Sequence, residues 1–222
     1  LMLYLITLVF VKSLHELGHA FVSKYFGCRV SSIGIAFLVF FPFLYTDTSD
    51  AWRLRDHKDR LLINFAGILT ELHLALISTF LWAILPDGGL KSVAFFIATT
   101  SWISSLAINV SPFMRFDGYY VFSDWLKAEN LQPRSFALAR WQLREILFGF
   151  NHPPPEDLNP TRRWTFISYA WLTWVYRFFI FLGIALLVYH LAFKTLGIIL
   201  FVIEIYWFIL RPIITETKNW YN

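Results

Sequence analysis

Five long apolar segments along the chain predict helices that cross a membrane. They comprise residues 1–22, 61–85, 92–110, 164–189 and 195–210. A membrane-spanning helix needs about 20 mainly apolar residues, and fewer where flanking side chains reach the interface. Arg177 interrupts the fourth segment, and the fifth is short. We expect an all-α polytopic membrane protein with about five transmembrane helices.

A further apolar stretch, residues 30–45, follows the first of these segments. It is too short to cross a membrane, and it is rich in Val, Ile and Phe, which favour strands. Gly34 and Pro42 interrupt it. We expect a small strand or hairpin at the membrane edge. Its role is open between packing and offering an edge to which an extended peptide adds as a further strand.

The connection between the third and fourth apolar segments is long and partly polar. Residues 135–149 alternate apolar with charged side chains, which is typical of an amphipathic helix at a membrane surface or packed on the core. The run Pro153-Pro154-Pro155 then indicates a stiff linker. We therefore divide the chain into a membrane core at 1–125, an interfacial helix with a Pro-rich linker at 126–163, and C-terminal membrane helices at 164–222.

The composition agrees with a membrane protein. The chain is 57% hydrophobic and 15% charged, with a mean hydropathy of +0.55, whereas soluble domains carry about a quarter charged residues. The one cysteine, Cys28, excludes an intrachain disulfide and a cysteine-based zinc cluster. The chain begins at Leu1 without a basic region and cleavage site, so we expect an excerpt or processed form of a longer protein rather than a signal peptide.

The basic residues fall mostly on one side of a five-span topology. Segments 23–60, 111–163 and 211–222 share that side and carry most of them: Lys24, Arg29, Arg53, Arg55, Lys58, Arg60, Arg115, Lys127, Arg134, Arg140, Arg144, Arg162, Arg163, Arg211 and Lys218. The opposite side has Lys91 and Lys194. By the positive-inside rule the first side is cytoplasmic. We expect an integral protein of the cell membrane, and no nucleic-acid partner is needed to explain the basic residues.

The first apolar segment contains the motif His15-Glu16-Leu17-Gly18-His19. On a helix, His15 and His19 share one face, so both imidazoles can reach one metal ion. Glu16 lies beside them, where a carboxylate can take a proton from water on the metal. Ionisable residues inside a membrane are costly and mark functional sites. The alternative is a hydrogen-bonded histidine pair that happens to flank a glutamate.

A catalytic zinc site usually has three protein ligands and an open position for water. Asp117 is the expected third ligand, since it follows the third apolar segment at the same cytoplasmic end as the two histidines. Gly118 beside it allows a tight turn or a close approach of the backbone. Glu71 and His73 are rival ligands. We expect Glu71 to pair instead with Arg177 or another polar neighbour, because a lone charge in lipid is costly.

These motifs resemble the site-2 protease family of intramembrane zinc metalloproteases. The resemblance rests on the motif at 15–19, on Asn109-Val110-Ser111-Pro112 and on Phe116-Asp117-Gly118, and it covers roughly residues 1–125. It implies that His15, His19 and Asp117 bind Zn²⁺ and that Glu16 is the general base. The Asp-Gly-Tyr-Tyr sequence is similar to a bacterial branch associated with peptide export and modification, often fused to further domains.

Two departures from the family pattern stand out. The stretch Phe65-Ala66-Gly67-Ile68-Leu69 lacks the proline that often follows Ala-Gly in the family, and Phe116 replaces the commoner leucine before the aspartate. The first departure concerns the positioning of the substrate more than the binding of metal.

We therefore expect a zinc-dependent intramembrane endopeptidase that hydrolyses membrane-embedded or membrane-associated peptides, with its active site toward the cytoplasm. Asn109 would bind the substrate backbone, or else bond helix to helix. The alternatives are a non-proteolytic subunit of a peptide export or maturation system that keeps a structural zinc, and a metal carrier. Expected partners are the lipid bilayer, the peptide substrate, and export-system proteins or fused domains outside this chain.

Overall fold

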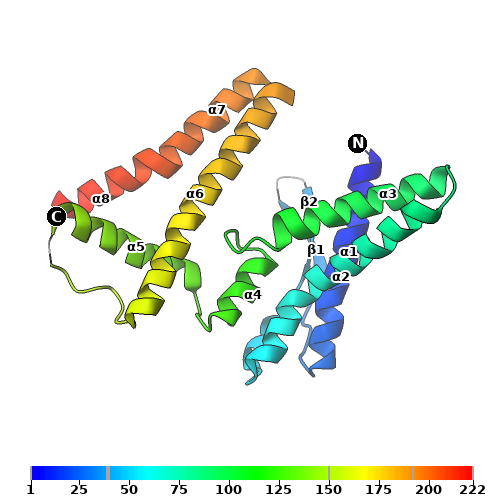
Figure 1. The fold of residues 1–222 in the computed structure, drawn as a ribbon, viewed down its shortest axis with the longest axis horizontal. Coiled ribbons are helices and arrows are strands. Elements are labelled where there is room, and N and C mark those ends of the chain that lie inside the picture. The colour runs from blue at the N-terminus through cyan, green and yellow to red at the C-terminus, as the bar shows by residue number, and fades with distance from the viewer. Residues whose placement is uncertain (1, 39–40, 150, 192, 222) are drawn as a thin grey trace. The chain divides into compact units, whose positions relative to one another are not determined.

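The computed structural model describes residues 2–38, 41–149, 151–191 and 193–221. These residues form two compact units, Leu1–Glu129 and Asn130–Asn222. Nearly all regular structure is helical, and one small antiparallel sheet follows the first helix (Figure 1). The predicted fold class is therefore confirmed.

The first unit contains the helices α1 (Met2–Tyr25), α2 (His57–Ile84), α3 (Gly89–Trp102) and α4 (Asp117–Trp125), the strands β1 (Ile33–Leu38) and β2 (Phe41–Thr46), a 3₁₀ turn η1 (Ser49–Arg53) and a π-helical segment η2 (Ile103–Asn109). The second unit contains α5 (Leu131–Phe148), α6 (Pro160–Leu191), α7 (Lys194–Ile205), the π-helical segment η3 (Tyr206–Leu210) and α8 (Arg211–Tyr221).

Within the described residues, five helical stretches are long and apolar enough to cross a membrane: Met2–Tyr25, His57–Ile84, Gly89–Asn109, Pro160–His190 and Lys194–Thr215. They match the five predicted segments. Large apolar side chains such as Phe21, Phe80 and Phe179 are 64–70% exposed on these helices. Such exposure suits side chains that face lipid rather than water.

The expected hairpin is present beside α1. The strands β1 and β2 pair antiparallel, with Ile33 opposite Thr46 and Gly34 opposite Tyr45. The hydroxyl of Thr46, at the end of β2, donates a hydrogen bond to the backbone carbonyl of Glu16 at 3.0 Å. This bond fastens the hairpin next to the motif at 15–19.

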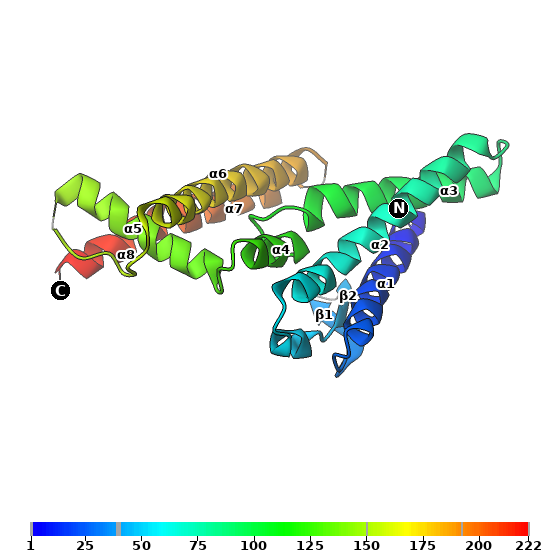
Figure 2. The ribbon, with the colours of Figure 1, turned by 60° about the horizontal axis from the view of Figure 1, so that its bottom comes forward.

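The helices α1, α2 and α3 pack against one another and form the core of the first unit (Figure 2). The contact of α1 with α2 is close at Gly18, where a Cβ would overlap the Thr70 hydroxyl. The third span changes winding at its end: the Val110 amide bonds to the Ser105 carbonyl, five residues back. Such π-helical turns are frequent at functional sites.

In the second unit, α5 packs on α6, with the rings of Phe136 and Trp174 5.5 Å apart. Helix α5 covers most of the stretch for which an amphipathic helix is predicted. Arg134 at its start forms an ion pair with Glu156 in the Pro-rich connection. The helices α6 and α7 form an apolar hairpin.

Candidate metal centre

Helix α1 places His15 and His19 on its buried face, one turn apart. The two residues are 4% and 8% exposed, and their Nε2 atoms are 3.2 Å apart. A helix places residues i and i+4 over one another, so the sequence spacing alone produces this approach.

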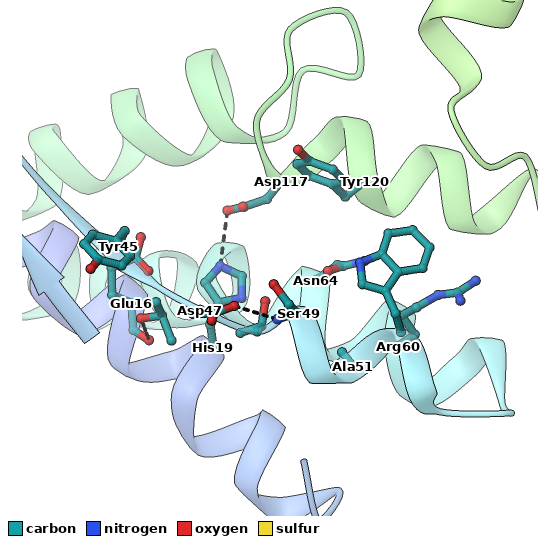
Figure 3. A pocket seen from close by; sticks show the side chains of 13 residues that line it. Glu16, His19, Tyr45, Asp47, Ser49, Ala51, Arg60, Asn64, Asp117 and Tyr120 are labelled. Carbon is teal, nitrogen blue, oxygen red and sulfur yellow. Dashed lines mark hydrogen bonds and ion pairs between the residues drawn. The ribbon is translucent and has the colours of Figure 1, made fainter. Parts of the chain in front are cut away.

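Asp117 meets the two imidazoles from the first turn of α4. Its Oδ2 lies 2.8 Å from His15 Nε2 and 3.5 Å from His19 Nε2. The nearest ligand atoms of the three residues all lie within 4.8 Å of one another. Figure 3 shows Asp117 facing His19 across the site. The structure thus brings together the three residues that the sequence analysis proposes as ligands.

The outer edges of both imidazoles are engaged elsewhere. His19 Nδ1 lies 2.8 Å from the carbonyl oxygen of Ile63, and His15 Nδ1 lies 3.0 Å from Glu71 Oε1. Both partners are acceptors, which favours the tautomers with the proton on Nδ1 and with the Nε2 lone pairs toward the carboxylate of Asp117. Asp117 Oδ2 is itself buried without a hydrogen bond. Three electron-rich atoms that converge in this way fit a cation, and the donor set of two imidazoles and a carboxylate suits Zn²⁺.

Two glycines allow the backbones to approach the site. A Cβ on Gly67 of α2 would overlap Nε2 of both His15 and His19. A Cβ on Gly118 would overlap the carbonyl of Val110, at the end of the third span. Gly67 therefore lets α2 pack closely against the two imidazoles. Gly118 lets the start of α4, which carries Asp117, pack closely against Val110.

A buried ion pair holds α4 against α2. Arg60 Nε donates to Asp124 Oδ1 at 2.8 Å, and Asn64 Nδ2 donates to Asp124 Oδ2 at 2.7 Å. The guanidinium of Arg60 also lies over the ring of Trp52. Burial raises the pKa of the Asp124 carboxyl above its ordinary value, although Arg60 acts in the opposite direction. Asp124 lies seven residues after Asp117, so this pair helps to fix the third candidate ligand.

A cavity of about 350 Å³ is lined by two of the three candidate ligands, His19 and Asp117. The lining residues come from α1, from the stretch 45–52 that joins β2 to η1, from α2 and from α4. They include Glu16, His19, Asp117 and Tyr120 (Figure 3). Glu16, the predicted general base, therefore borders the same space as two of the candidate metal ligands.

The other polar residues of the apolar segments take different positions. Glu71 pairs with Lys12 at 2.8 Å, a polar neighbour of the kind expected as an alternative to Arg177. Glu71 approaches the Nδ1 edge of His15, whereas Asp117 approaches the Nε2 edge, so Glu71 does not replace Asp117 as a ligand. His73 is exposed and bonds to the Leu69 carbonyl of its own helix.

Asn109 is buried, and its amide nitrogen donates to Glu71 Oε2 at 2.9 Å. This contact joins η2 to α2, which is the helix-to-helix bond considered for Asn109. Its contact with substrate stays a prediction.

Sequence reasoning missed several residues that shape the site. Lys12 lies three residues before His15 on the same helix, and a lysine inside an apolar segment was a usable signal. Arg60 and Asp124 carry no such signal, because their pairing depends on the packing of α4 against α2.

Residues 3–101, somewhat less than half of the chain, match the family model of peptidase family M50. No curated protein and no solved structure matches the chain. The matched residues contain the motif at 15–19 and end before Asn109 and Asp117. Over these residues the chain is therefore similar to peptidase family M50, the site-2 protease family of intramembrane zinc metalloproteases.

Proposed function

We propose that the protein is a zinc-dependent intramembrane endopeptidase that cleaves membrane-embedded or membrane-associated peptides. The observation that carries the proposal is the convergence of His15, His19 and Asp117 beside a cavity that Glu16 also lines. The match of residues 3–101 to a metalloprotease family supports it independently of the geometry.

The chemistry follows from the residues around the cavity. A bound zinc ion would polarise the scissile carbonyl and lower the pKa of its water to about 7. Glu16 accepts a proton from the attacking water and delivers it to the leaving amine nitrogen, so that a carboxylic acid and an amine result. The hydrogen bond from Thr46 to the Glu16 carbonyl holds the backbone of this residue beside the hairpin.

The number of ligands favours catalysis over a purely structural zinc. Structural zinc sites are usually closed by four protein ligands, whereas catalytic sites keep one position open. Three candidate ligands converge here among the described residues, and the cavity lies beside them. This arrangement supports an endopeptidase rather than an export subunit with a structural metal.

We propose that the substrate binds as an extended strand. A transmembrane helix hides its carbonyls in hydrogen bonds, so it has to unwind locally before cleavage. The hairpin of β1 and β2 lies against α1 next to Glu16 and offers a strand for main-chain pairing. The distribution of basic residues supports a site that opens toward the cytoplasm of a cell membrane.

The test compares the purified protein with its Glu16→Gln variant on a panel of labelled single-span peptides. The variant is expected to bind zinc as the wild type does and to cleave about 10²–10⁴ times more slowly, since it lacks the general base. His73→Gln serves as the control, because His73 is exposed and bonds only to its own helix in the contacts seen here. Equal cleavage by Glu16→Gln and wild type would overturn the assignment.

A further inference from the structure

Glu71 is a carboxylate buried completely inside the apolar helix α2. Its side chain is 0% exposed, and it contacts residues from two other helical segments, α1 and η2. Oε1 accepts from Lys12 Nζ at 2.8 Å and from Ser104 Oγ at 3.2 Å, and it lies 3.0 Å from His15 Nδ1. Oε2 accepts from Asn109 Nδ2 at 2.9 Å. A carboxylate with this many donors is fully satisfied.

The position of Glu71 relative to His15 is specific. It contacts the imidazole on the edge opposite the one that faces Asp117. Because a carboxylate only accepts, this contact favours the tautomer with the proton on Nδ1, in which the Nε2 lone pair is directed at the candidate metal position. Carboxylates that hold metal-binding histidines in this way fix the orientation of the ring and raise its basicity.

Lys12 explains how the site tolerates a second buried carboxylate. A lone charge in an apolar interior is costly, and removing one partner of a buried pair leaves the other uncompensated. Lys12 lies three residues before His15 on α1, and its ammonium neutralises Glu71. The helix that supplies two candidate ligands therefore also supplies the counter-charge.

We infer that Glu71 is a positioning residue that orients His15 for metal binding, with Lys12 as its counter-ion and with Ser104 and Asn109 as its supports. The inference rests on the proposed function, since it presupposes that His15 binds zinc. Glu71 is neither one of the three candidate ligands nor the candidate general base, so this role is separate from theirs. Asn109 acts through its hydrogen bond to Glu71.

The test measures metal binding rather than cleavage. The full chain in detergent is titrated with Zn²⁺ against a chelator, and with Co²⁺ while the visible spectrum is recorded. Glu71→Gln is expected to weaken zinc binding about 10–100-fold and to alter the Co²⁺ spectrum. Glu204→Gln is the matched control: Glu204 is also a buried glutamate in an apolar helix, but it lies in the second unit, so its variant should bind both metals as the wild type does.

A second variant distinguishes a loss of zinc affinity from misfolding caused by an unpaired buried charge. Glu71→Gln leaves Lys12 without its counter-charge, whereas the double variant Lys12→Met with Glu71→Gln removes both charges together. The double variant is expected to fold and to show the same loss of zinc affinity as Glu71→Gln.

The outcomes separate the inference from the proposed function. If the double variant binds zinc as tightly as the wild type and gives the same Co²⁺ spectrum, then Glu71 is a packing residue and the inference is wrong. If the wild type itself binds no zinc, the proposed function fails and the inference fails with it.

Discussion

At the scale of single residues, Gly67 shows how little space surrounds the candidate metal centre. It is the point where α2 touches both imidazoles, and a Cβ there would overlap Nε2 of each ring. The absence of a side chain at this position is therefore part of the site. Sequence patterns predict that a glycine permits close approach, but they do not tell which partner approaches it.

Substituting Gly67→Ala is expected to lower zinc affinity about 5–150-fold, because overpacking that costs about 1–3 kcal/mol has to displace one of the imidazoles. Metal content measured after equilibration with a chelator checks this prediction. Gly183→Ala in α6 is the control, since no heavy atom lies within 4 Å of the Cβ that it would add. Unchanged zinc affinity in Gly67→Ala would mean that the imidazoles do not hold the metal in this position.

At the scale of elements, the short helix α4 carries Asp117 at one end and is held to α2 by Asp124 at the other. The clamp consists of Arg60 and Asn64, both from α2. Gly118 adds a close backbone contact with the end of the third span. The third candidate ligand thus depends on three separate contacts that fix one helix.

The variant Asp124→Ala leaves the buried guanidinium of Arg60 without its carboxylate. We expect the free energy of unfolding to fall by about 3–5 kcal/mol, and we expect zinc to bind more weakly, although Asp124 is not a ligand. Thermal unfolding in detergent and a zinc titration measure the two effects. The exposed Asp157 provides the control, as Asp157→Ala should change neither quantity. Zinc affinity at the wild-type level in Asp124→Ala would show that α4 does not need this clamp.

The sequence predicts the elements better than their contacts. Composition and length locate the five spans, because lipid demands long apolar helices. The spacing of His15 and His19 predicts their shared face, since helix geometry is local. The π-helical winding of Ile103–Asn109 has no such local signal, because its apolar residues suit an α-helix equally well. The contacts of Glu71 depend on which faces of three segments meet, so sequence periodicity leaves them undetermined.

At the scale of the whole molecule, orientation in the membrane decides where water and substrate reach the site. In the orientation that we propose from the basic residues, the loop before α2 lies on the cytoplasmic side and the turn between α2 and α3 on the opposite side. His15 and His19 lie nearer the C-terminal end of α1, which leads into the basic segment 23–60.

Single cysteines test this orientation in intact cells. In a Cys28→Ser background, Asp87→Cys is expected to react with a membrane-impermeant thiol reagent, since Asp87 is 97% exposed and lies in the turn that the proposed orientation has outside the cell. Lys58→Cys, at the start of α2, should react only after the cells are permeabilised. The reverse pattern of labelling would place the active site on the opposite side of the membrane.

We expect one zinc ion to bind between His15, His19 and Asp117. X-ray absorption at the zinc edge, combined with metal analysis of the purified chain, tests it most directly. The expected result is one zinc ion per chain with nitrogen and oxygen ligands at about 2.0–2.2 Å, lost in Asp117→Ala and kept in His73→Ala. One zinc ion per chain with an unchanged spectrum in Asp117→Ala would contradict it.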